Sequence, residues 1–156
     1  MKKIAAAVER DNKLLAAADV TDLPLVVIAG PTAIGKTELA IRIAKKFNGE
    51  VISADSRAIY RGLDIGTAKP TSEEQQGIAH WGIDIVDPGE RFTAANFKVY
   101  AQRKISEIRS RGHLPIIAGG TGLYIDSVLY DFKFTAYSNN LDERRKLENK
   151  SLEQLV

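Results

Sequence analysis

The residues best suited to chemistry lie in one glycine-containing run between positions 30 and 37. Gly30 and Gly35 are followed by Lys36 and Thr37 at the spacing of a P-loop. In such a loop the backbone N–H groups point at a phosphate, the lysine adds charge and the hydroxyl can bind Mg²⁺. We therefore expect a diphosphate or triphosphate to bind eight residues, Gly30, Pro31, Thr32, Ala33, Ile34, Gly35, Lys36 and Thr37.

Asp55 is the second candidate for chemistry, because it follows the short apolar run 50–54. Two later acids are less suitable, since Asp84 lies inside its own predicted strand and Asp87 lies in a Pro-Gly turn. The apolar run 114–118 ends in glycines and not in the carboxylate typical of a hydrolytic motor. Asp55 could orient metal-bound water or act as a general base. The structural alternative for Asp55 is an Asx-turn or a helix N-cap.

Apolar spacing predicts the elements that hold these groups. We expect strands at 25–29, 50–54, 81–86 and 114–118, and helices at 37–47, 93–111 and 123–129. Asn48 supplies a left-handed stop for the first helix, and Thr93 an N-cap for the second. Residues 60–76 show no period and predict a long surface loop. Alternating strands and helices predict the α/β class, with a P-loop NTPase-like parallel sheet covered by helices on both faces.

Composition predicts one globular domain with appended segments. The 156 residues are 44% apolar and 27% charged. We expect an N-terminal extension at residues 1–22, whose composition is compatible with a helix, and a P-loop core at 23–135. Residues 136–156 then begin a helical region that stops without an end signal, so the fold is expected to be truncated at the C-terminus.

Charge and cysteine content limit the setting of the protein. The absence of cysteine excludes disulfides and thiolate metal sites and predicts a cytoplasmic location. No apolar run approaches the ~20 residues that a membrane span needs, so we expect no membrane partner. The net charge of +2 neither requires nor excludes nucleic acid. The basic groups at 57–69 and 144–146 are best interpreted as solvated surface on charge alone.

Four blocks of sequence resemble the tRNA dimethylallyltransferase family. They are the P-loop 30–37, Ser53-Ala54-Asp55-Ser56-Arg57, the run 60–70 (Tyr-Arg-Gly-Leu-Asp-Ile-Gly-Thr-Ala-Lys-Pro) and Gly119-Gly120-Thr121-Gly122-Leu123-Tyr124. The resemblance implies that the P-loop binds the diphosphate of dimethylallyl diphosphate, with Mg²⁺ on Thr37. It also implies transfer of the prenyl group to N6 of the adenosine next to the anticodon, so that the partner is a tRNA anticodon stem-loop.

The resemblance also implies roles for single residues. Asp55 accepts the adenine proton as the catalytic base, and Thr121 lies at the substrate as a second catalytic residue. Contacts to tRNA are implied for Asp55, Ser56, Arg57, Ala58, Thr121 and Arg144.

The chain departs from the family pattern at three points. Ala58 stands where the family has glutamine, and Ile34 where a small serine is common. Family members are also much longer, so we expect this chain to bind diphosphate with Mg²⁺ but to prenylate tRNA poorly.

Three other functions remain open from the sequence. A P-loop small-molecule kinase would place ATP on the loop and use Asp55 to activate a hydroxyl. An adenine-nucleotide isopentenyltransferase would share both the P-loop and the base. A non-enzymatic P-loop module would only bind anions or RNA.

Overall fold

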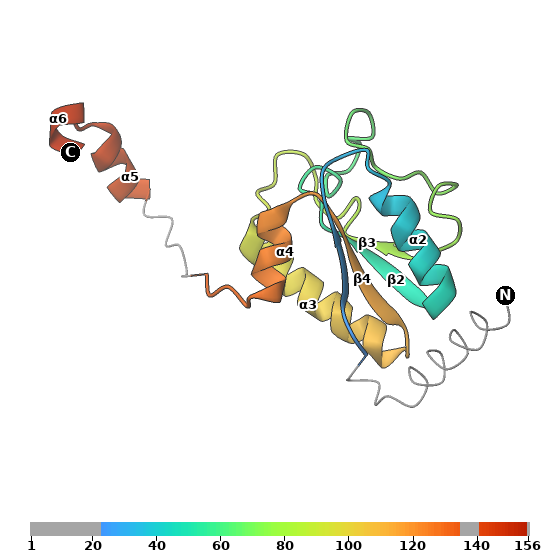
Figure 1. Ribbon diagram of the computed structural model, residues 1–156. Helices are drawn as coiled ribbons and strands as arrows, with labels where there is room; N and C mark the ends of the chain where they lie inside the picture. The colour runs from blue at the N-terminus through green and yellow to red at the C-terminus, as the bar shows by residue number, and fades with distance from the viewer. Residues whose placement is uncertain (1–22, 135–140, 156) are drawn as a thin grey trace, which may run out of the picture.

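The computed structural model describes residues 23–134 and 141–155 (Figure 1). The predicted extension 1–22 and the predicted boundary at 135–136 lie outside these ranges. The elements are β1 (Val26–Ala29), α2 (Lys36–Phe47), β2 (Gly49–Ser53), β3 (His80–Trp81), α3 (Ala94–Ser110), β4 (Leu114–Gly119), α4 (Gly122–Leu129), α5 (Leu141–Glu148) and α6 (Leu152–Leu155). In the described part of the chain, no helix is long and apolar enough to cross a membrane.

The strands form one parallel sheet in the order β1-β4-β2-β3. Successive residues point to opposite faces of a strand, so neighbours in sequence enter different cores. Val51 and Ile116 pack with α2 on one face, whereas Ile52 and Ile117 pack with α3 and α4 on the other. Figure 1 shows this arrangement, with α2 on one side of the sheet and α3 and α4 on the other. The predicted α/β class, the parallel sheet and the helices on both faces are confirmed.

The helix ends follow the predicted signals. Asn48 ends α2 in the left-handed conformation, with φ of 52°. Thr93 caps α3 by accepting a hydrogen bond from the Asn96 backbone, and the Asn96 side chain accepts one from Thr93 in return. This reciprocal capping satisfies two N–H groups that would otherwise lack partners. The predicted loop at 60–76 contains turns and one isolated bridge, from Tyr60 to Val86.

The predicted third strand, 81–86, is wrong beyond its first residue. β3 consists of His80 and Trp81 only. The chain turns at Gly82, with φ of 81°, and again at Asp84, with φ of 53°, and left-handed residues cannot continue a strand. A Cβ at Gly82 would lie 2.9 Å from the Ser53 carbonyl oxygen. The turn thus places the backbone at Gly82 close to the end of β2. The alternation of apolar residues in the sequence gives no indication of this contact.

An ion pair around the buried Glu50 carboxylate joins the elements at the amino-terminal edge of the sheet. Glu50, the second residue of β2, accepts hydrogen bonds from Arg111 (2.8 and 3.0 Å) and from Trp81 (2.6 Å), and contacts His113 Nδ1 at 2.7 Å. Burial alone would raise the pKa of Glu50, but these hydrogen bonds outweigh it and lower the pKa. The carboxylate therefore ties β2, β3 and the segment before β4 together.

Candidate functional site

The candidate site lies where three parallel strands end. β1 runs into the P-loop, β2 runs into Asp55, and β4 ends at Gly119. Open α/β sheets bind ligands at this carboxyl edge. A cavity of about 270 Å³ opens there. Its lining comprises Thr32, Ala33, Gly35, Lys36, Thr37, Ser53, Asp55, Ala68, Ala118, Gly119 and Gly120.

The P-loop has a backbone suited to an anion. Ala33 and Gly35 are left-handed, with φ of 66° and 84°, and α2 begins directly afterwards at Lys36. The first N–H groups of a helix have no acceptor within it, so they are free for a ligand. The Lys36 ammonium donates to the Pro31 carbonyl, which holds the side chain over the loop. Ile34 is 59% exposed and points away from the core.

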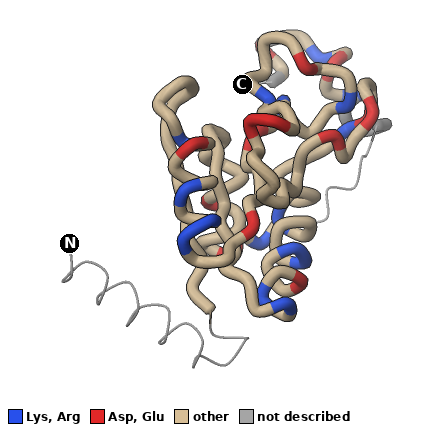
Figure 2. The backbone as a smooth tube through the Cα atoms, turned by 90° about the vertical axis from the view of Figure 1, so that its right-hand side faces the viewer, with Lys and Arg blue, Asp and Glu red and all other residues tan. Residues whose placement is uncertain are grey.

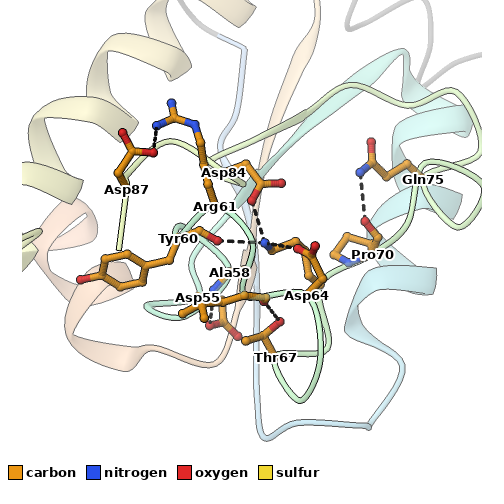
Figure 3. Close-up of polar contacts among 12 residues, drawn as sticks. Asp55, Ala58, Tyr60, Arg61, Asp64, Thr67, Pro70, Gln75, Asp84 and Asp87 are labelled. Carbon is orange, nitrogen blue, oxygen red and sulfur yellow. Dashed lines mark hydrogen bonds and ion pairs between the residues drawn. The ribbon is translucent and has the colours of Figure 1, made fainter. Parts of the chain in front are cut away.

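Asp55 adopts the Asx-turn considered from the sequence, and its role as a general base stays a prediction. Its Oδ1 accepts hydrogen bonds from the backbone of Arg57 (2.8 Å) and Ala58 (3.2 Å), which is an Asx-turn. Within the described residues, Oδ2 receives no hydrogen bond. The turn thus fixes the carboxylate at the wall of the cavity and leaves one oxygen for a ligand (Figure 3).

Thr121 supports this turn from the side of α4. Its hydroxyl accepts a hydrogen bond from the Ser56 backbone at 3.0 Å, and its own N–H donates to the Ala54 carbonyl at 3.0 Å. Thr121 does not line the cavity. The structure therefore connects Thr121 with Asp55 through the backbone between them, and its predicted contact with substrate stays a prediction.

Tyr124 is a buried phenol close to the same turn. It stacks on Phe97 with ring centroids 4.3 Å apart, and 5% of the residue is exposed. Burial raises the pKa of Tyr124, and the neighbouring Tyr60 and Asp55 raise it further. Tyr124 therefore stays a neutral phenol in the ordinary range of pH.

The other predicted tRNA contacts lie in different environments. Ser56 and Arg57 are exposed beside Asp55. Ala58 is 2% exposed, so its methyl group belongs to the core and its N–H is used by Asp55. Arg144 belongs to α5, and its side chain lies outside the described part of the structure. The roles of these four residues stay predictions.

Lys69 is the residue that the sequence analysis misjudged. Its ammonium donates to the Tyr60 carbonyl (2.9 Å), Asp64 (2.7 Å) and Asp84 (2.7 Å). Figure 3 labels these three partners. Only 6% of the Lys69 side chain is exposed. The interpretation as solvated surface is wrong at this position. Burial lowers the pKa of Lys69, but the two carboxylates raise it above its ordinary value. The sequence contains one sign of this pairing. Asp64 lies 5 residues before Lys69, and Asp84 lies 15 residues after it.

Acidic and basic residues are otherwise interspersed. Figure 2 shows Lys and Arg mixed with Asp and Glu along the described part of the tube. Arg61, for example, pairs with Asp87 at 2.8 Å in an exposed position.

A family model and individual known proteins that resemble this chain point to the same kind of enzyme. Residues 58–156 match the family described as IPP transferase. The tRNA dimethylallyltransferase of Staphylococcus carnosus (strain TM300) is 57% identical over 126 residues, covering 81% of this chain and 40% of the relative. The chain thus spans about two fifths of the length of the curated relatives it matches.

Two solved structures of enzymes with similar names share the fold. The full-length tRNA isopentenylpyrophosphate transferase from Bacillus halodurans matches with a TM-score of 0.72 and 50% identity, over 81% of this chain and 42% of that one. A structure of a eukaryotic dimethylallyltransferase acting on tRNA matches with a TM-score of 0.69 and 34% identity, over 84% of this chain and 31% of that one.

Proposed function

Because the chain belongs to the IPP transferase family, we propose that it transfers a dimethylallyl group from dimethylallyl diphosphate to N6 of the adenosine next to the anticodon in tRNA. The observation that carries this proposal is the composition of one cavity. The P-loop residues Lys36 and Thr37 line it together with Asp55. A group that binds diphosphate and a group that accepts a proton are thus within reach of one ligand.

The P-loop is suited to holding the leaving group. An allylic diphosphate leaves readily once its negative charge is neutralised, and preformed donors aimed at that charge stabilise it. The free N–H groups at the start of α2 and the ammonium of Lys36 supply such donors, with the Thr32 hydroxyl beside them. Lys36 would exchange the Pro31 carbonyl for a phosphate oxygen.

The donor set also fits Mg²⁺. Among the residues that the structure describes, no three His, Cys, Asp or Glu side chains form a metal cage. Mg²⁺ in phosphate sites commonly uses one or two protein oxygens together with phosphates and water. The Thr37 hydroxyl, which lines the cavity, would hold it. When bound, Mg²⁺ would neutralise the charge that develops on the departing diphosphate.

Asp55 would act as the general base. As the N6–C1 bond forms and the bond from C1 to the diphosphate oxygen breaks, the amino group must lose a proton. The free Oδ2 would take that proton, while Oδ1 keeps the carboxylate in place through the N–H groups of Arg57 and Ala58. Asp55 would thus act on the attacking N6, while the P-loop would hold the diphosphate that leaves C1.

The exposed turn after Asp55 would meet the RNA. A base must leave its stack to enter a site of this size. Ser56 and Arg57 are exposed next to the cavity and would contact the extruded adenosine and its neighbours. The eukaryotic relative acts on tRNA, in keeping with this partner. We place the reaction in the cytoplasm, in keeping with a chain that has no cysteine.

The identity of the donor can be tested by binding. The chain is titrated with dimethylallyl diphosphate, dimethylallyl monophosphate and ATP, each with Mg²⁺ and with pyrophosphate as competitor. We expect the prenyl diphosphate to bind best, with pyrophosphate displacing it. Tighter binding of ATP would overturn the proposal and favour a kinase.

The acceptor requires a second experiment. Labelled dimethylallyl diphosphate is incubated with an anticodon stem-loop or with AMP, and the position of the label is determined. Label on N6 of the stem-loop adenosine supports the proposal. Label on AMP alone indicates an adenine-nucleotide isopentenyltransferase instead.

A further inference from the structure

The Lys69 ammonium joins two places in the loop 60–76, Tyr60 and Asp64, to Asp84 beyond the loop. It donates to the Tyr60 carbonyl at 2.9 Å, and to Asp64 and Asp84 at 2.7 Å each. With 6% of its side chain exposed, the ammonium has exchanged most of its water for these oxygens. A buried lysine is tolerated when it is paired in this way, and loss of one partner leaves the other unsatisfied.

Two strained residues accompany this lysine. Ala68, directly before Lys69, has φ of 51°, and Asp84, whose carboxylate pairs with Lys69, has φ of 53°. Left-handed backbone is costly for residues other than glycine and persists where surrounding contacts enforce it. Such strain concentrates at ligand sites. Ala68 fits this description, because it lines the cavity together with Lys36 and Asp55.

The rest of the loop gives Ala68 little support. The Thr67 hydroxyl donates a hydrogen bond to the Leu63 carbonyl at 2.6 Å, which is a contact within the loop itself. Ile65, at the tip, is 98% exposed and contributes nothing to the core. Tyr60 and Asp84, by contrast, belong to backbone bonded to the body of the protein, since Tyr60 bridges Val86 and Asp84 N–H donates to Ala58. Lys69 is therefore a group that attaches residues 62–68 to that body, in addition to the contacts at the two ends of the loop, such as Lys45 with Gln76.

We propose that Lys69 is a positioning residue of the diphosphate site, which holds Ala68 in the cavity wall through Tyr60, Asp64 and Asp84. The inference rests on the function proposed above and extends it to a residue outside the P-loop. The ammonium acts on the shape of the site and not on the ligand itself. Loss of the anchor lets Ala68 leave its strained conformation, and the cavity then no longer fits a diphosphate.

Lys98 provides a matched control for this idea. It is also a largely buried lysine, with 14% of its side chain exposed, and it also binds a carbonyl and a carboxylate, those of Phe132 (2.8 Å) and Asp131 (2.6 Å). Neither Lys98 nor its partners line the cavity. Lys69→Met and Lys98→Met thus remove similar interactions from different places.

The experiment measures binding of Mg²⁺-pyrophosphate by calorimetry, and amide hydrogen exchange of residues 62–68, in the full chain and both variants. We expect Lys69→Met to raise the dissociation constant roughly tenfold or more, as small displacements in a site can do, and to speed exchange in the loop. Lys98→Met should stay within about twofold of the unchanged chain, which is ordinary for a site away from the ligand.

Each result decides the proposal. Unchanged affinity in Lys69→Met, or equal weakening in Lys98→Met, overturns it. If Lys69→Met does not fold, Asp64→Asn replaces it. Asp64 is exposed and shares the lysine with Asp84, so this variant should fold and weaken binding by a smaller factor, and unchanged affinity would contradict the inference. Absence of binding in the unchanged chain would instead contradict the proposed function, and the inference with it.

Discussion

Substitution of Gly119 by alanine gives a quantitative test of how β2 and β4 meet at the site. A Cβ at this position would lie 2.2 Å from the Ala54 carbonyl oxygen, where ordinary contact begins at 3.4 Å. The obstructing atoms are backbone and cannot rotate away. They are also fixed by hydrogen bonds, since Ala54 donates to Ala118 at 2.8 Å and accepts from Thr121 at 3.0 Å.

The cost follows from what must move. Relief of the clash needs a separation of more than 1 Å between two central strands, which costs about 1–3 kcal/mol as overpacking. The two hydrogen bonds that hold Ala54 add roughly 1 kcal/mol each when they are lost. We therefore expect Gly119→Ala to lower the free energy of unfolding by about 3–5 kcal/mol, and the melting temperature by roughly 6–20 °C. Thermal unfolding followed by circular dichroism measures this.

Gly122→Ala is the matched control. The same methyl group there would meet nothing within 4 Å, at the first residue of α4. Alanine is the better helix former, so stability should be unchanged or rise by up to about 1 kcal/mol. If Gly119→Ala melts within about 2 °C of the unchanged chain, a shift that corresponds to about 0.5–1 kcal/mol, the described approach of β2 and β4 is incorrect.

Four further outcomes are expected. Lys36→Met should weaken pyrophosphate binding at least about tenfold, the result of losing roughly 1.4 kcal/mol, as calorimetry would show; equal affinity would remove Lys36 from the site. Asp55→Asn should leave binding of dimethylallyl diphosphate nearly unchanged. It should slow prenyl transfer by about 10²–10⁴-fold, the usual contribution of a general base. An unchanged transfer rate would refute that role. Thr93→Ala should lower the free energy of unfolding by about 1 kcal/mol in urea titrations, because α3 loses its cap, and no change would contradict the capping. The pKa of Glu50 is lowered on folding. The stabilisation that this carboxylate gives is therefore present above its unfolded pKa, near 4.5, and is lost as the pH falls through its folded pKa. Glu50→Gln should flatten the acid side of a stability–pH profile, and an unaltered profile would contradict the described ion pair.

The positions of elements that the structure confirms, as distinct from the roles of the site residues, depended on local patterns. The P-loop needs only a buried strand, a glycine run and the start of a helix in sequence, and all three are present around Lys36. Asp55 could be selected because a parallel sheet brings the carboxyl ends of its strands to one edge. Thr93 was identifiable because capping involves residues only three positions apart.

The features that were missed depend on tertiary contacts. The predicted third strand failed because Gly82 and Asp84 adopt left-handed backbone, which brings the chain against β2. The support that Thr121 gives to Ser56 spans 65 residues and follows from no local rule. Lys69 looked like any exposed cation, since its burial depends on how the loop returns to Asp84.

The central claim is that the P-loop holds the group leaving C1 while Asp55 takes the proton from the N6 that attacks C1, and one structure would test it most directly. The chain would be crystallised with Mg²⁺ and a non-reactive thio analogue of dimethylallyl diphosphate, and the distance from C1 to Asp55 Oδ2 measured. We predict phosphates on the P-loop and C1 within roughly 6–7 Å of Oδ2, which leaves room for N6 at attack and hydrogen-bonding distances between them. Phosphates bound elsewhere, or a prenyl chain directed away from Asp55, would contradict the account.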